Sequence, residues 1–250
     1  MKKVNLLLAM SAFAFFACNQ QQQGENAEVS EAKDVQEAAA EAVDFQVNTE
    51  NSLTSFIGSK PAGKHNGTIN ISGGILSVAG NEIAGGKITI DMNTITSSDF
   101  PEDEEMLGKL VGHLKSPDFF DVATHPTAEF VITAVEAYDA ADSIEVKEEF
   151  DSEFKPAAAN EFVVDNPTHK VTGNLTMRGT TLSIAFPAKI SVTEGTVSAE
   201  AKFNIDRTLW GVMYGDEASV ADKAKDRFVY NTVNVGLNIS ASKEAEATEM

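Results

Sequence analysis

Apolar and polar residues alternate along most of the chain between residues 43 and 240. The alternation is longest in 181–192, where every second residue from Leu182 to Val192 is apolar. Further apolar-faced runs lie at 43–48, 52–58, 67–78, 86–95, 128–135, 170–179, 196–205 and 231–240. Since a strand turns successive side chains to opposite faces, the pattern predicts roughly eight to ten antiparallel strands, each with one apolar and one wet face.

These runs are long for β-strands, and short turns that contain glycine separate them. Several exceed the usual ~5–6 residues, and glycine marks turns at 72–74, 79–86, 178–181 and 193–196. Long strands with tight connections favour a closed meander, which also leaves no exposed sheet edge. We therefore predict an all-β fold, an antiparallel eight-stranded barrel. The interior of such a barrel is wide enough for packed side chains or for one small ligand.

One segment, 99–120, departs from the period of two. Acidic residues stand at its start and basic residues toward its end, which suits a helix dipole, and Asp99 is the expected N-cap. Apolar residues recur at helical spacing at Met106, Leu107, Leu110, Val111 and Leu114. The sequence thus predicts one or two short helices that cap an end of the barrel, with Phe119 and Phe120 as a lid over a hydrophobic tunnel.

The N-terminus has the features of an export signal. Two lysines follow Met1, and the apolar run at 4–17 is too short to span a bilayer as a mature helix. The run ends at Cys18, the only cysteine of the chain, and resembles the lipobox of a bacterial lipoprotein. This resemblance implies a lipid on Cys18 that anchors an exported protein in the outer membrane, on its periplasmic or cell-surface side. An ordinary secretory signal that happens to contain a cysteine is the alternative.

Composition divides the rest of the chain. Residues 19–43 are rich in Gln, Glu and Ala and lack aromatic residues, so they cannot bury enough apolar surface to offset the entropy of ordering. An acidic stretch interrupts the strands at 139–168. The predicted organisation is a signal peptide at 1–17, a lipidated disordered tether at 18–43, a barrel domain at 44–240 with an acidic insertion at 139–168, and a disordered tail at 241–250.

Charge and cysteine content exclude several partners and chemistries. The chain has 38 Asp and Glu against 19 Lys and Arg, a net charge of −19. Such a surface repels phosphate backbones, so no nucleic-acid partner is expected. It is not attracted to an acidic membrane either, which leaves the lipid anchor as the expected link to the membrane. With Cys18 expected to carry lipid, neither a disulfide within the chain nor a thiolate site is expected.

No catalytic signature is present in the sequence. It contains no G-x-S-x-G, no phosphate-binding glycine loop and no H-E-x-x-H. Four histidines occur at no metal-binding spacing, at His65, His113, His125 and His169. We therefore expect a protein that is not an enzyme and has neither a metal site nor a cofactor. A metal cluster that only folding brings together is the alternative.

The inward apolar faces and the lid form the candidate binding site. The residues predicted to contact a ligand are Phe119, Phe120, Phe130, Ile132, Leu175, Met177, Ile184, Phe186 and Phe203. The alternative is that these side chains fill a dry core. A polar headgroup would need partners at the mouth, and Lys60, Lys64 and His65 are candidates on one loop, with a plain solvated loop as the alternative. We expect structural roles for Arg207, paired with a carboxylate, and for Trp210, closing the barrel bottom.

Several motifs, taken in order, resemble the YceI-like family. They span about residues 43–240 and read "GKHNG", "LKSPDFFDVATHPTAEF", "VTGNLTMRGTTLSIAFPAKI" and "FNIDRTLWGVMYG". The resemblance implies a lipocalin-like barrel that binds polyisoprenoid and related amphipathic lipids in the bacterial envelope.

Two functions remain as hypotheses. In the first, a non-enzymatic lipoprotein holds an isoprenoid or quinone-like amphiphile in its lumen and carries, buffers or protects it, including under envelope stress. In the second, an envelope interaction module with a filled core acts through its acidic surface. The sequence leaves the ligand's identity and the oligomeric state open, a homodimer included.

Overall fold

The computed structural model describes residues 27–35, 41–139, 146–221 and 228–243. Its strands are β1 (Glu28–Glu31), β2 (Val43–Val47), β3 (Leu53–Lys60), β4 (Gly63–Ala79), β5 (Glu82–Asp91), β6 (Thr96–Ser97), β7 (Thr127–Ala137), β8 (His169–Met177), β9 (Thr180–Val192), β10 (Thr196–Asp206) and β11 (Thr232–Lys243). The helices are α1 (Glu104–Lys115) and the short 3-10 segments η1 (Met92–Thr94), η2 (Arg207–Trp210) and η3 (Glu217–Ser219). The predicted signal peptide, Cys18 and most of the predicted tail lie outside the described residues.

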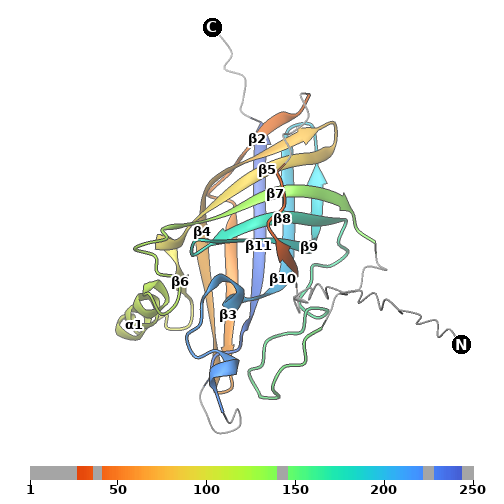
Figure 1. Cartoon of the computed structure of the whole chain (residues 1–250). Coiled ribbons are helices and arrows are strands. Elements are labelled where there is room, and N and C mark those ends of the chain that lie inside the picture. Colours follow the sequence, from red (N-terminus) through yellow and green to blue (C-terminus); the bar gives the residue numbers. More distant parts are fainter. Residues whose placement is uncertain (1–26, 36–40, 140–145, 222–227, 244–250) are drawn as a thin grey trace, which may run out of the picture.

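Eight wall positions close into an antiparallel barrel (Figure 1). Around the wall, β4, β5, β7, β8, β9, β10 and β11 follow one another, and β2 and β3 together fill the position between β11 and β4. They share it because β11 pairs with β3 through residues 233–238 and with β2 through residues 241–243. The predicted eight-stranded barrel is confirmed.

The alternation of apolar and polar residues in the sequence corresponds to the inner and outer faces of this wall. On β9 the inward residues Ile184, Phe186 and Ala188 are at most 3% exposed, whereas Thr181 and Lys189 on the same strand are exposed. The same alternation on the other wall strands places one apolar cluster inside the barrel. Burial of these side chains at ~25 cal/mol per Å² is the main stabilising contribution to the fold.

β1 fills a seam in the wall. β9 and β10 pair only where residues 188–192 meet residues 197–201, and β1 pairs with residues 182–185 of β9 beyond that point. The Ala27 amide donates to the Asn204 carbonyl of β10 at 2.9 Å, so this segment bridges both strands. The prediction of a disordered tether is therefore wrong for Glu28–Glu31. Two unpaired strand edges supply the backbone hydrogen bonds that order it.

α1 lies at the lower left of the barrel in Figure 1, beside β6. Its N-cap is Asp103, whose side chain accepts from the Met106 amide at 2.9 Å, and not Asp99 as predicted. Leu114 is the buried residue of the predicted apolar stripe, whereas Met106 is exposed. The helix therefore contributes mainly its last turn to the core.

The described part of the acidic insertion, 146–168, covers the outer face of β10 and β11. Side-chain amides of Asn204 and Asn234, one on each strand, donate to the Ala157 carbonyl at 2.9 and 3.0 Å. The Ala157 amide donates in return to Asn234 Oδ1 at 3.2 Å. No strand forms within this described stretch, which these side-chain hydrogen bonds hold in place instead of a strand ladder.

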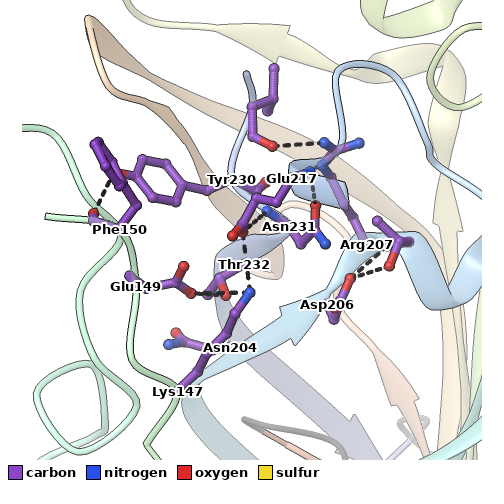
Figure 2. Close-up of polar contacts among 12 residues, drawn as sticks. Lys147, Glu149, Phe150, Asn204, Asp206, Arg207, Glu217, Tyr230, Asn231 and Thr232 are labelled. Carbon is purple, nitrogen blue, oxygen red and sulfur yellow. Dashed lines mark hydrogen bonds and ion pairs between the residues drawn. The ribbon is translucent and has the colours of Figure 1, made fainter. Parts of the chain in front are cut away.

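A buried polar cluster ties the start of this insertion to the barrel (Figure 2). Lys147 Nζ lies 3.1 Å from Glu217 Oε1 and 3.6 Å from Glu149 Oε1. Thr232 of β11 donates to Glu149 Oε1, while Glu149 Oε2 is buried with no hydrogen-bond partner among the described residues. Burial raises the pKa of Glu149, and the Glu217 carboxylate adds to the rise, against the opposing effects of Thr232 and Lys147.

We expect the substitution Glu149→Gln to stabilise the protein at neutral pH. Because the folded state holds the Glu149 proton more tightly than the unfolded chain, its stabilising contribution is full below the ordinary glutamate pKa and is lost as the pH rises through the raised one. Glutamine keeps an oxygen for Thr232 but buries no charge, which favours the variant by roughly 1 kcal/mol near neutrality.

Urea unfolding at acidic and neutral pH measures this effect, and the advantage of Glu149→Gln is expected to disappear at acidic pH. Glu148→Gln, at the exposed neighbouring residue, is the matched control and should leave stability unchanged. A Glu149→Gln variant that is less stable than the wild type at neutral pH would contradict this account of the cluster.

No helix within the described residues is both long enough and apolar enough to cross a bilayer.

Candidate functional site

The barrel contains a cavity of 150 Å³ toward the end where α1 lies. Its accessible wall is apolar, and every wall position contributes side chains to it. The lining also includes Leu114 of α1, Phe119 and Phe120 of the following loop, and Val212 and Val229 of the loops beyond β10. A cavity of this kind excludes water and favours an apolar guest.

A pair of aromatic rings separates this cavity from a second space of 30 Å³ in the other half of the barrel. Phe130 and Phe186 line both, with ring centroids 5.6 Å apart. Phe186 also stacks on Phe203 at 4.1 Å and 11°. The predicted hydrophobic tunnel is divided in this structure, because close packing of these rings fills its middle.

The predicted lumen residues largely converge on the cavity. Eight line it, namely Phe119, Phe120, Phe130, Leu175, Met177, Ile184, Phe186 and Phe203. The ninth, Ile132, lines the smaller space instead. Other lining residues were not singled out from the sequence, among them Thr54, Phe56, Ile69, Ile88, Met92, Val233 and Val235. Most of these residues occupy the inward positions of the alternating pattern. Their place in that pattern is therefore the sequence signal that could have identified them as lining residues.

Two loops close this end of the barrel, and Arg178 holds them together. Its guanidinium donates to the carbonyls of Pro117 and Phe119 in one loop, at 2.7 and 2.6 Å, and to the Gly211 carbonyl in the other, at 2.7 Å. Arg178 sits in the tight β8–β9 turn with a φ of 50°, which side chains other than glycine rarely adopt. The two phenylalanines therefore form a fixed lid at the cavity, as the sequence suggested, with a clamp that it did not predict.

Arg207 and Trp210 stabilise the same end. The Arg207 side chain is buried and donates to three carbonyls, those of Val212, Val229 and Tyr230. The expected partner, a carboxylate, is thus replaced by backbone oxygens that the loops leave unpaired. Burial lowers the pKa of Arg207 despite the nearby acidic residues. Trp210 is fully buried and donates to the Leu175 carbonyl at 3.1 Å, which fits its predicted closing role.

The predicted headgroup residues do not converge on one point. Lys64 and His65 are neighbours on β4, so their side chains leave opposite faces. His65 Nδ1 lies 2.8 Å from Asp99 Oδ2, and Lys64 is exposed. Although burial acts to raise it, hydrogen bonds from Asn66 and His65 hold the pKa of Asp99 below its usual value. His65 therefore serves first as the partner of Asp99.

Within the described part of the chain, no group of three or more His, Cys, Asp or Glu side chains is placed to hold a metal ion.

Comparisons with known proteins agree with this architecture. The YceI-like domain family model matches residues 24–241. No curated protein matches the chain. The fold is similar to that of Burkholderia cenocepacia BcnA, with a TM-score of 0.53 and 18% identity over 78% of this chain and 99% of that one. It is also similar to a polyisoprenoid binding domain from Saccharophagus degradans implicated in plant cell wall breakdown, with a TM-score of 0.52 and 14% identity over 80% of this chain and 98% of that one.

The family match extends over nearly the whole barrel and includes β1, which lies in the segment predicted to be a tether. At these identities the structural similarities show the fold alone. The family match, together with the closed barrel and its apolar lumen, shows that the chain belongs to the YceI-like domain family.

Proposed function

We propose that this protein binds an amphipathic isoprenoid-type lipid in the lumen of its barrel and is not an enzyme. The single observation that supports this most strongly is the apolar 150 Å³ cavity inside the wall. The binding of a polyisoprenoid, stated for the Saccharophagus degradans relative, supports the same class of ligand. The alternative module with a filled core would require an interior without this cavity.

The size of the cavity sets what it holds. An apolar cavity of about 150 Å³ accommodates a molecule of benzene's size, so the lumen as it stands holds roughly one five-carbon isoprene unit. At ~0.8 kcal/mol for each buried CH₂, one such unit contributes about 4 kcal/mol. Tighter binding requires more of the tail, which needs Phe130 and Phe186 to rotate and join the two spaces that they now separate.

We also propose that the protein is located at the outer membrane. A lipid on Cys18 would hold the barrel at the outer membrane of the bacterial envelope, and the periplasmic or cell-surface side would follow from sorting. The nine residues between Cys18 and Glu28 can span at most about 35 Å. Such a tether would keep the barrel close to the bilayer that contains its ligand. In this role the protein carries, buffers or protects that lipid, including under envelope stress.

Native mass spectrometry of the full chain, extracted gently from membranes, tests the proposal. We expect one bound lipid per barrel, and displacement by added prenyl alcohols whose affinity rises with each isoprene unit until the lumen is full. An unliganded mass in repeated preparations, together with no uptake of added prenyl alcohols of any length, would contradict it.

A further inference from the structure

The seam between β9 and β10 lies along the cavity. The ladder between these two strands covers only five residues of each, and beyond it they separate. Past that point β9 contributes Ile184 and Phe186 to the cavity lining, and β10 contributes Phe203 and Ile205. The rings of Phe186 and Phe203 stack across the seam, with centroids 4.1 Å apart. The residues on both sides of the seam therefore form part of the cavity wall.

Contacts at the protein surface hold β1 in this seam. Four of its residues pair with β9, and the Ala27 amide donates to the Asn204 carbonyl of β10 at 2.9 Å. Val29 packs against the core and is partly buried, whereas the other three residues of the strand are exposed. Most of what holds β1 is thus backbone hydrogen bonding at the surface, which water can replace when the strand leaves.

Asn174 of β8 fastens the chain that follows β1. Its side-chain nitrogen donates to the Lys33 carbonyl at 2.7 Å, and its Oδ1 accepts from the Lys33 amide at 2.9 Å. Asn174 is 7% exposed, and its inward neighbour Leu175 lines the cavity while Asn174 does not. One side chain outside the lumen therefore supplies both hydrogen bonds that a strand partner would supply to Lys33.

The other routes to the cavity are obstructed by more deeply buried groups. At the lid end, the buried Arg207 side chain binds three carbonyls and Trp210 is fully buried. From the opposite end, Phe130 and Phe186 stand between the smaller space and the cavity. β1 is the first strand of the described chain, and eleven residues separate it from β2. It can therefore leave β9 one residue at a time without moving another strand.

We propose that the seam between β9 and β10 is the entrance to the lumen, that β1 is its gate and that Asn174 is the latch of this gate. The inference rests on the proposed binding of a lipid in the lumen and adds the route by which the lipid arrives. Release of β1 exposes apolar side chains on both edges of the seam, so a prenyl chain enters sideways along its length. Parting of Phe186 from Phe203 at the seam also frees the Phe186 ring for the rotation that joins the two spaces.

A gate affects the rates of binding and leaves the affinity unchanged. The lipid passes the same barrier when it enters and when it leaves, and β1 is closed in both the empty and the loaded barrel. A variant in which β1 opens more often therefore raises the association and dissociation rates by the same factor. A residue that contacts the lipid changes the ratio of the two rates instead.

The test measures both rates on the full chain with tritiated farnesol, a prenyl alcohol, separated from the free probe by rapid gel filtration. Asn174→Ala removes the two hydrogen bonds of the latch, and Val29→Ser weakens the apolar contact of β1. We expect each to raise both rates about tenfold, with Kd unchanged. Val35→Ser, at a residue of the same segment that is 54% exposed, is the matched control and should leave both rates as they are.

Hydrogen exchange follows the gate without any lipid. The amides of β1 should exchange about tenfold faster in Asn174→Ala and Val29→Ser than in the wild type. The amides of β10 and β11, which pair along eleven residues, should exchange at the same rate in all three proteins.

The outcomes separate this inference from the function on which it rests. Wild-type protein that takes up no farnesol would overturn the lipid-binding proposal and the entrance with it. Unchanged farnesol rates in Asn174→Ala and Val29→Ser, although their β1 amides exchange faster, would overturn the gate and leave lipid binding intact. Rates that rise only in Arg178→Ala, which loosens the lid, would place the entrance at Phe119 and Phe120 instead.

Discussion

Replacing Phe186 by arginine is expected to abolish the binding of prenyl lipids. Phe186 is 3% exposed, stacks on Phe203 and borders both spaces of the lumen. A guanidinium at this point would face Phe130 and Phe203, which offer no acceptor, and would draw water into the site where the tail binds. Titration with a prenyl alcohol should detect no saturable binding, and the free energy of unfolding should fall by about 3 kcal/mol or more.

A milder substitution separates loss of the cavity from loss of the fold. Val235 lines the cavity and is partly buried, so Val235→Phe fills part of the empty volume with an apolar ring. Losing space for two or three CH₂ groups costs about 2 kcal/mol, which corresponds to roughly a thirtyfold weaker affinity. Asn238→Phe, on the exposed outer side of the same strand, is the control and should bind normally. Equal affinities for the wild type and Val235→Phe would show that the lipid binds elsewhere.

The substitution Arg207→Met should produce the largest loss of stability. The guanidinium supplies the hydrogen bonds for the carbonyls of Val212, Val229 and Tyr230, and methionine supplies none. Three buried acceptors would then lack partners, and each charge-assisted bond contributes about 1.5 kcal/mol or more. We expect the free energy of unfolding, measured in guanidinium chloride, to fall by about 4 kcal/mol.

Lys202→Met is the matched control for this prediction. Lys202 lies on β10, the strand that leads directly to Arg207, and its side chain points outward. It forms a partly exposed ion pair with Glu200, in which Nζ and Oε1 are 3.7 Å apart. Such surface pairs contribute about 0–1 kcal/mol. If Arg207→Met changed stability no more than Lys202→Met does, the three carbonyls would not depend on the guanidinium.

The barrel and its inward residues could be predicted from the sequence because alternation specifies both at once. A strand in which Leu182, Ile184 and Phe186 share one face has few ways to bury them, and a closed wall is the one that leaves no edge. The same reasoning found most of the cavity lining. It could not find the division of the lumen, because the position of the Phe186 ring depends on Phe130 and Phe203, which lie on other strands.

Three features of the structure could not be predicted, because the local sequence signal for each of them is weak. β1 reads as polar, and it is a strand only because β9 and β10 leave a seam that it can fill. Asp99 resembles an N-cap in sequence, but His65 and Asn66 bind its carboxylate, and Asp103 caps the helix. Thr54 stands between Leu53 and Ser55 in a run whose alternation is ambiguous, so its inward orientation is evident only in the folded barrel.

The central claim is that the lipid occupies the inside of the barrel, and methionine methyl groups test it directly. Met92 and Met177 line the cavity, whereas Met106 and Met213 are exposed on the outside. With methionine methyls labelled with carbon-13, NMR should detect nuclear Overhauser contacts from a bound prenyl chain to Met92 and Met177 and none to Met106. Contacts to Met106 and Met213 without any to Met92 and Met177 would place the lipid on the surface and contradict the account.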